Sequence, residues 1–510
     1  MHATPSPTSR LRERFVLTLV FLAACWLYLG NLGNILLWQD EAQTALIAKT
    51  VLARGIPYGT DGVNFFSQER GAEYGENFVY KWQTWLPFYV LALFFQLFGE
   101  STFVARLPFA LFGMATLFLL HRYVREATGD GKTAMFTTLV LCVSIPWLLL
   151  ARQCRYYSMT AFFALLALYG FLRIVTGRRW GETIFATGAV ALFHCHYLYV
   201  ASLLAAVGLQ TLLLHRDRLL RMLLVTGVVI GINAPWLIWL SGMKYGQAYS
   251  ASFLDPQLFL WRLTGFARDS AAHALPLPFL GAALAVGIGL VFRCRPPRGR
   301  DGGCTLSPHL LTPLLFIVFT LVALCASAPA PFFRYLSPLL PLYALIAGVV
   351  LRLAWQLHPL VTGALALYLL SRQPLLPYFH ELTHDYTGPV ERIVDHLKAN
   401  ASPTDVVAIT YGDMPVKFYT GLRVVGGLTG EDLAPARNAD WIVIRQHLIS
   451  DKDAEVRDFL ARTSDWHNYE RIVLPGPDVP FENRESPDEH LFASPTEGPP
   501  LIIFRRRPST

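Results

Sequence analysis

Residues 15–42 read FVLTLVFLAACWLYLGNLGNILLWQDEA, an apolar run that ends directly before two carboxylates. About 20 apolar residues are needed to cross a bilayer core of about 30 Å, so the run from Phe15 to Leu37 predicts a membrane span. Arginines precede it and no small-residue cleavage site follows, which indicates a retained span with a cytoplasmic N-terminus. Carboxylates at the exit of a span are costly unless water or a substrate uses them. Asp40 and Glu41 are therefore candidate functional residues.

The composition of the whole chain agrees with a membrane protein. Of its 510 residues, 53% are hydrophobic and only 15% are charged, which is too apolar for a soluble enzyme of this length. The net charge of +7 does not indicate nucleic-acid binding, because the basic residues cluster in short loops between apolar runs, where membrane orientation explains them. The seven cysteines show no disulfide framework and no zinc spacing.

The first loop after this span is long and decides the topology. Helical spacing predicts a helix on the membrane surface over Glu41–Leu52. The apolar segment Trp85–Phe98 has only 14 residues. If it does not cross, every later basic cluster lies inside, as the positive-inside rule expects, so we predict a partly inserted helix there. Further spans are expected at 103–121, 133–150, 158–174, 181–194, 197–214, 222–241, 275–292, 308–326, 336–352 and 357–371.

The predicted fold class is therefore a polytopic α-helical membrane protein with about 11 to 13 transmembrane helices, and the segments above give about eleven crossings. A transmembrane domain covers residues 1–372, with the first outer loop at 38–102, and a small α/β domain outside the membrane covers 373–510. Helices are expected in this second domain at 389–399, 415–420 and 454–462, and strands at 406–411, 441–445, 471–474 and 501–504. The spacing of Asp413 and Lys417 favours a helical ion pair over a site. The domain is read as a lid, an acceptor-docking unit or a structural cap.

This topology brings a carboxylate and several cations to the outer face. An enzyme that joins a sugar to a hydroxyl with inversion needs one carboxylate to remove the acceptor proton and cations to hold the departing phosphate. Asp40 is the candidate base, and Lys81, Arg152, Arg155 and Arg334 are the candidate cations. Lysine offers phosphate a point charge, whereas arginine clamps it with two parallel hydrogen bonds.

Several short segments together carry a family resemblance. They are Asp40-Glu41-Ala42, Tyr80-Lys81-Trp82, Phe98-Gly99 with Ala105-Arg106-Leu107-Pro108, Ala151-Arg152-Gln153-Cys154-Arg155-Tyr156-Tyr157, and Phe333-Arg334-Tyr335-Leu336-Ser337-Pro338. In this order and spacing the chain resembles the GT-C glycosyltransferases, in the family-39-like branch similar to bacterial protein O-mannosyltransferases and lipid A aminoarabinose transferases. The resemblance implies a GT-C fold, a polyprenyl-phosphate sugar as donor, Asp40 as catalytic base, and Lys81 and Arg334 around the lipid phosphate.

Each remaining candidate residue also has an alternative structural role. Glu41 is a second candidate catalytic group, although both carboxylates also suit the N-terminus of the helix that follows. Lys81 also suits an interfacial anchor, and the arginines also suit ordinary headgroup contacts. We predict substrate contacts for Tyr156, Tyr335, His194 and His196, with packing as the alternative for the two histidines.

A metal site is left open by a departure from the family pattern. Relatives often carry an acidic residue before the lysine and an aspartate shortly after the arginine-containing segment, but here Tyr80 and Ser158-Met159-Thr160 stand at those places. We predict no obligatory cofactor, and a divalent metal remains an alternative.

The sequence thus predicts an inverting glycosyltransferase at the outer face of a bacterial cytoplasmic membrane. Its partners are a polyprenyl-phosphate sugar, a lipid, glycan or protein acceptor, and membrane lipids, with no nucleic acid. The alternative is a transporter or flippase of lipid-linked sugars, although no internal repeat with paired mid-depth ionisable residues is present. A third reading, a membrane anchor for a binding domain, leaves the cations of the outer face unexplained.

Overall fold

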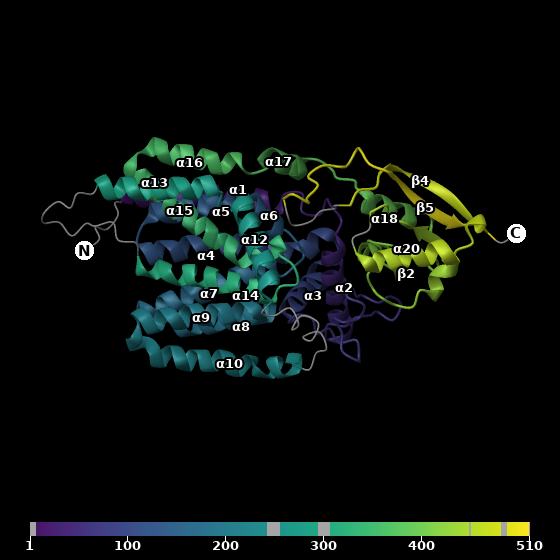
Figure 1. Cartoon of the computed structure of the whole chain (residues 1–510), viewed down its shortest axis with the longest axis horizontal. Helices are drawn as coiled ribbons and strands as arrows, with labels where there is room; N and C mark the ends of the chain where they lie inside the picture. Colours follow the sequence, from purple (N-terminus) through teal and green to yellow (C-terminus); the bar gives the residue numbers. More distant parts are fainter. Residues whose placement is uncertain (1–6, 242–254, 294–306, 448–449, 481–486, 509–510) are drawn as a thin grey trace.

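The structure, a computed structural model, describes residues 7–241, 255–293, 307–447, 450–480 and 487–508. A bundle of helices runs along the long axis, and a mixed α/β domain lies at one end of it (Figure 1). The bundle contains α1 (Pro7–Leu29), α4 (Thr102–Thr128), α5 (Gly131–Cys142), α6 (Ile145–Ala151), α7 (Tyr157–Val175), α8 (Gly181–Cys195), α9 (Tyr197–Leu214), α10 (Leu219–Ser241), α12 (Pro256–His273), α13 (Leu277–Arg293), α14 (Leu311–Ser327), α15 (Leu340–Leu357) and α16 (Pro359–Ser371).

The chain is a polytopic helical membrane protein. Within the described ranges, six helices are long and apolar enough to cross a membrane, and two bent helix pairs raise this number to eight. Three expected spans are missing from this number, because Phe15–Leu29 and Pro359–Ser371 are shorter apolar helices and α8 has only 15 residues. The expected span 133–150 is instead two helices, α5 and α6, bent by 67° where Pro146 enters α6.

Close helix contacts in the bundle depend on glycine. A Cβ atom on Gly170 of α7 would lie 2.3 Å from the backbone nitrogen of Phe185 in α8, and one on Gly188 would lie 2.6 Å from that of Ala167. Small residues that let two backbones approach are typical of helix pairs in membranes, where the lipid is as apolar as the side chains. These two glycines therefore fix the packing of α7 against α8.

The first outer loop contains α2 (Gln39–Arg54) and α3 (Leu86–Phe98). At 13 residues, α3 is about 20 Å long and too short to cross the bilayer core. The residues before and after α3 both contact other parts of this same loop. The indole of Trp85 donates to the Tyr80 carbonyl at 2.8 Å, and Glu100 pairs with Lys49 at 2.8 Å. The helix therefore begins and ends at one end of the bundle.

Two of the basic loops contact each other at the opposite end. Helix α4 starts beside the α/β domain, where the Thr102 hydroxyl meets that of Tyr419 at 2.7 Å, and its 27 residues run about 40 Å away from it. Near its far end Glu126 pairs with Arg178 at 3.1 Å and Arg122 at 3.3 Å. Arg122 and Arg178, from two of the predicted basic loops, therefore lie together at this end, and the basic stretch at 295–300 lies outside the described residues.

The C-terminal region follows α17 (Leu375–Thr383) and forms a five-stranded sheet in the order β2-β1-β3-β5-β4. Its elements are α18 (Pro389–Asn400), β1 (Val406–Ile409), α19 (Asp413–Thr420), β2 (Arg423–Gly426), β3 (Trp441–Val443), α20 (Asp451–Thr463), β4 (Tyr469–Pro477) and β5 (Pro500–Arg506). Strands β2 and β3 both pair with β1 in parallel, while β5 pairs antiparallel with β3 and β4. The sequence analysis did not predict β2, which has only two apolar residues, Val424 and Val425, between Arg423 and Gly426.

Candidate functional site

A cavity of ≈ 490 Å³ opens where the first outer loop meets the outer ends of the bundle helices. Four segments line it: α2 with the loop that follows it, the turn between α6 and α7, the start of α9, and the stretch from the end of α14 into a 3-10 helix, η3 (Phe333–Leu339). Its polar lining residues are Asp40, Gln43, Gln68, Glu69, Glu73, Tyr80, Trp82, Gln83, Arg155, Tyr156, His196, Tyr197, Ser327, Arg334 and Tyr335.

Asp40 lies in the first turn of α2, where the helix dipole favours a carboxylate. Its Oδ2 is 3.5 Å from Nη2 of Arg155 and 3.4 Å from Nη1 of Arg334. Arg155 also donates to the Asp40 carbonyl at 3.3 Å and to the Thr44 hydroxyl at 3.0 Å. The carboxylate is therefore held between two guanidinium groups at the cavity wall.

Aromatic rings hold both guanidinium groups in place. The guanidinium of Arg334 lies 4.4 Å from the ring centroid of Phe332 and 5.9 Å from that of Tyr335. That of Arg155 lies 5.5 Å from the ring centroid of Tyr156. Cation–π contacts orient a guanidinium without using its hydrogen-bond donors. Two arginines at the wall of one cavity can bind a phosphate group.

Glu41 does not line the cavity, and we correct its expected catalytic role. Its side chain is fully buried, and its two oxygens accept from Nε and Nη2 of Arg106 at 2.8 and 2.6 Å. The backbone nitrogen of Cys154 donates to the same carboxylate at 2.7 Å. Neighbouring helix positions point about 100° apart, so Asp40 faces the cavity and Glu41 faces the bundle.

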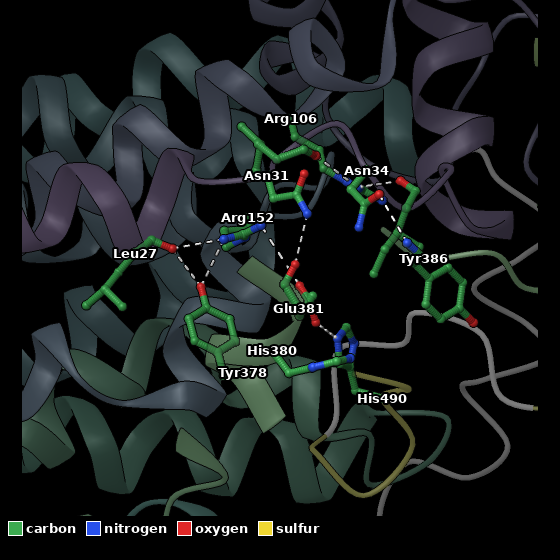
Figure 2. A network of polar contacts seen from close by, with 12 residues as sticks. Leu27, Asn31, Asn34, Arg106, Arg152, Tyr378, His380, Glu381, Tyr386 and His490 are labelled. Atoms are coloured by element: carbon green, nitrogen blue, oxygen red, sulfur yellow. Dashed lines mark hydrogen bonds and ion pairs between the residues drawn. The ribbon is translucent and has the colours of Figure 1, made fainter. Parts of the chain in front are cut away.

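Arg152 also lies away from the cavity, and its expected role in phosphate binding is corrected. Its Nη1 donates to the Leu27 carbonyl at 2.9 Å and to the Tyr378 hydroxyl at 3.1 Å, while Nη2 is 3.9 Å from Glu381 (Figure 2). The amide of Asn31 donates to the Glu381 carbonyl at 2.9 Å. Arg152, which directly follows α6, therefore links α1 to α17.

Two further candidates lie outside the cavity lining. Nζ of Lys81 is 5.0 Å from the ring centroid of Trp239, and His194 packs edge-on against Trp236 at 5.1 Å between ring centroids. Both side chains therefore contact α10. The structure brings neither Lys81 nor His194 into the cavity lining, and their expected contacts with phosphate and substrate stay predictions.

Tyr156, Tyr335 and His196 do line the cavity. The ring of His196 lies 5.2 Å from that of Tyr156 and 4.8 Å from that of Tyr199. Burial, and to a smaller extent the charge of Arg155, lowers the pKa of His196 to about 4. His196 is therefore neutral near pH 7.

The sequence analysis did not predict that polar residues of the first outer loop form one wall of the cavity. The Glu73 carboxylate accepts from the Ser67 hydroxyl at 2.6 Å and from the backbone nitrogens of Gln68 and Glu69 at 2.6 and 3.0 Å. Burial raises the pKa of Glu73 despite these bonds. Gln43 joins them, since its amide donates to Glu73 at 3.2 Å. The signal in the sequence was the density of glutamate and glutamine between residues 68 and 83.

Comparisons with known proteins fit this architecture. A model of the family described as dolichyl-phosphate-mannose-protein mannosyltransferase matches residues 83–239. The structure is similar to that of ArnT from Cupriavidus metallidurans bound to undecaprenyl phosphate, with a TM-score of 0.58 and 15% identity over 96% of this chain and 97% of that one. The chain has the GT-C fold. The apo form of ArnT gives a TM-score of 0.59 and 16% identity over 88% of this GT-C chain and 94% of ArnT. No curated protein matches the chain by sequence.

The polar groups of the cavity indicate which kind of ion it can bind. Among the described residues, no group of three or more His, Cys, Asp or Glu side chains is arranged to hold one. Asp40 is bracketed by two arginines, and the Glu73 carboxylate is occupied by donors of its own loop. The described side chains are therefore suited to bind an anion rather than a cation.

Proposed function

We propose that this chain is an inverting glycosyltransferase that moves a sugar from a polyprenyl-phosphate donor to an acceptor hydroxyl. The observation that carries the proposal is the position of Asp40, which is 3.4 Å from Arg334 and 3.5 Å from Arg155 at the wall of a polar cavity. One carboxylate next to two fixed cations is what this reaction needs, because a proton is removed at one place while negative charge develops on a phosphate nearby.

The reaction follows from these positions. The acceptor hydroxyl gives its proton to the Asp40 carboxylate, and its oxygen forms a bond to the anomeric carbon. The bond between that carbon and the phosphate oxygen breaks, and the phosphate leaves with the electron pair. Arg155 and Arg334 bind the departing phosphate. Attack from the face opposite the leaving group inverts the anomeric centre.

The distances around Asp40 allow the arginines to take part. Charge-assisted hydrogen bonds between N–H donors and carboxylates are about 2.7–2.9 Å long. The contacts of Asp40 at 3.4 and 3.5 Å are longer, so they are ion pairs of moderate strength. A phosphate in the cavity can therefore compete with the Asp40 carboxylate for both guanidinium groups.

The proposed site lies at the outer face of a bacterial cytoplasmic membrane. The positive-inside rule assigns the end with Arg122 and Arg178 to the cytoplasm. The C-terminal domain lies at the opposite end (Figure 1), and α2, which lines the cavity, contacts this domain through Gln39, so we assign residues 373–510 to the outside and residues 1–372 to the catalytic membrane domain. The ArnT structure of the same fold was solved with undecaprenyl phosphate, which supports a lipid phosphate as leaving group.

The test is transfer of radiolabelled sugar from a panel of polyprenyl-phosphate sugars to lipid, glycan and peptide acceptors in membranes. Native chain and Asp40→Asn are compared with Glu76→Gln, which removes an exposed carboxylate of the same loop. We expect transfer by the native chain and by Glu76→Gln, and none by Asp40→Asn. Movement of the lipid across the membrane that needs no Asp40, with no transfer from any donor, would instead establish a flippase.

A further inference from the structure

The first turn of α2 is held by two different parts of the molecule. Gln39 is bound by the C-terminal domain, because its side-chain amide donates to Oδ1 of Asp413 at 2.7 Å and its oxygen accepts from the backbone nitrogen of Met414 at 3.4 Å. Glu41 is bound by Arg106 of the bundle. Asp40, between them, faces the cavity. Because each helix position is rotated by about 100° from the last, the two flanking contacts together set the direction of Asp40.

The contact on the side of the C-terminal domain is buried and charged. Asp413 pairs with Lys417 one turn later in α19 at 2.8 Å, and both side chains have 0% exposure. This confirms the helical ion pair predicted from the spacing. Nζ of Lys417 also donates to the Phe65 carbonyl of the outer loop at 2.8 Å. A buried pair is weak evidence for stability, but its fixed hydrogen bonds give a defined geometry.

The packing around Asp413 leaves little room for movement. A Cβ atom on Gly427 would lie 2.1 Å from Oδ1 of Asp413, so only glycine lets the loop after β2 approach this carboxylate. Gln39 and Asp413 are 3% and 0% exposed. Other ion pairs at the same boundary are different: Arg70 and Glu455 meet at 2.7 Å, but their side chains are 50% and 60% exposed.

We propose that Asp413 is a positioning residue for the transfer reaction, which through Gln39 fixes the rotation of the first turn of α2 and so the direction of the Asp40 carboxylate. This inference rests on the proposed function. It makes the C-terminal domain part of the machinery that orients the base, although none of the described residues of that domain lines the cavity. Misplacement of a reacting group by 1 Å can lower a rate by about 100-fold, so a small rotation of α2 affects turnover strongly.

The experiment uses the full chain, purified in detergent, with three variants. Gln39→Leu removes the amide, and Gln39→Glu places a carboxylate against Asp413. The third, Gln39→Glu with Asp413→Asn, exchanges the two groups: the amide at 413 donates to the carboxylate at 39 and its oxygen accepts from Lys417, whose charge the carboxylate at 39 then balances. The matched control is Glu455→Gln, which breaks an exposed pair across the same boundary. Each protein is assayed for kcat and KM, for undecaprenyl phosphate binding and for thermal unfolding.

We expect Gln39→Leu and Gln39→Glu to lower kcat by about 10- to 100-fold, while the Kd of undecaprenyl phosphate stays within about twofold of the native value. The exchanged pair should recover most of kcat, and Glu455→Gln should match the native chain. Native kcat in both single variants would refute the proposal. So would a loss of binding and thermal stability in parallel with kcat, or an exchanged pair that is no better than Gln39→Glu.

A second readout separates this inference from the proposed function. Absence of transfer by the native chain with every donor removes the proposed function alone. Amide hydrogen exchange then tests the positioning contact directly. Gln39→Leu should accelerate exchange in residues 40–45 of α2 and leave that of α20 unchanged. Unchanged exchange in α2 would overturn the inference whatever the activity.

Discussion

Replacing Asp40 by asparagine should affect turnover and donor binding in opposite directions. Loss of a general base lowers a rate by about 100- to 10,000-fold, which corresponds to about 3–5 kcal/mol in the barrier. The carboxylate also has gross Coulomb attractions of about 5 kcal/mol to each guanidinium, at 3.4 and 3.5 Å and an effective dielectric constant of about 20. In Asp40→Asn, no carboxylate lies beside Arg155 and Arg334, so a phosphate does not have to compete with one for these two cations. Undecaprenyl phosphate should therefore bind at least as tightly to the variant as to the native chain.

The assay measures single-turnover transfer from a saturating polyprenyl-phosphate sugar, together with the Kd of undecaprenyl phosphate for both proteins. Saturation with donor separates the chemical step from binding. Asp40→Glu provides a control that keeps the carboxylate but moves it. A variant Asp40→Asn that retains more than about a tenth of the rate would contradict the role of base. Weaker binding in this variant would contradict the charge arrangement.

Three further outcomes follow from the geometry. Arg334→Gln removes a charged donor beside Asp40, and since a charge-assisted hydrogen bond contributes about 1.5–3 kcal/mol, the Kd of undecaprenyl phosphate should rise by about 10- to 100-fold in a binding titration. Arg106→Met leaves the buried Glu41 unpaired and should destabilise the chain by about 3–5 kcal/mol, seen as earlier thermal unfolding, whereas Glu41→Met with Arg106→Met should recover much of the loss. The lowered pKa of His196, about 4 against a usual 6.5, adds stability that is complete above pH 6.5 and is lost as the pH falls toward 4. Thermal unfolding of His196→Gln should therefore depend less on pH in this window than that of the native chain, and equal slopes would refute this.

The fold could be predicted from the sequence because long apolar runs and basic loops constrain a membrane protein strongly. The short segments were the difficulty. The interruption at Val143 and Ser144 between α5 and α6 leaves the hydropathy of the run unchanged, so a hydropathy pattern does not separate one span from a bent pair. Helix α12 was not expected, because its charged residues Arg262, Arg268 and Asp269 interrupt the apolar pattern.

The site was predicted in part, and its errors have one cause. Sequence spacing places side chains on the same face only if the backbone between them is helical. Arg152 and Arg155 have the spacing of one helical turn, but α6 ends at Ala151 and α7 starts at Tyr157, so the two side chains point to different places. The sequence did not distinguish Asp40 from Glu41 as the catalytic base, because the distinction depends on Arg106 of α4, which pairs with Glu41.

The contact between Gln39 and Asp413 has a consequence for biosynthesis. The two residues are 374 positions apart, so the first turn of α2 leaves the ribosome long before its partner exists. At about 5–20 residues per second, this interval lasts roughly 20–75 s. During that time a nascent chain has the carboxylate and the cations of its membrane domain but lacks the anchor at Gln39. Full activity should therefore appear only after the last domain has folded, which limits premature turnover of the lipid-linked donor by unfinished chains.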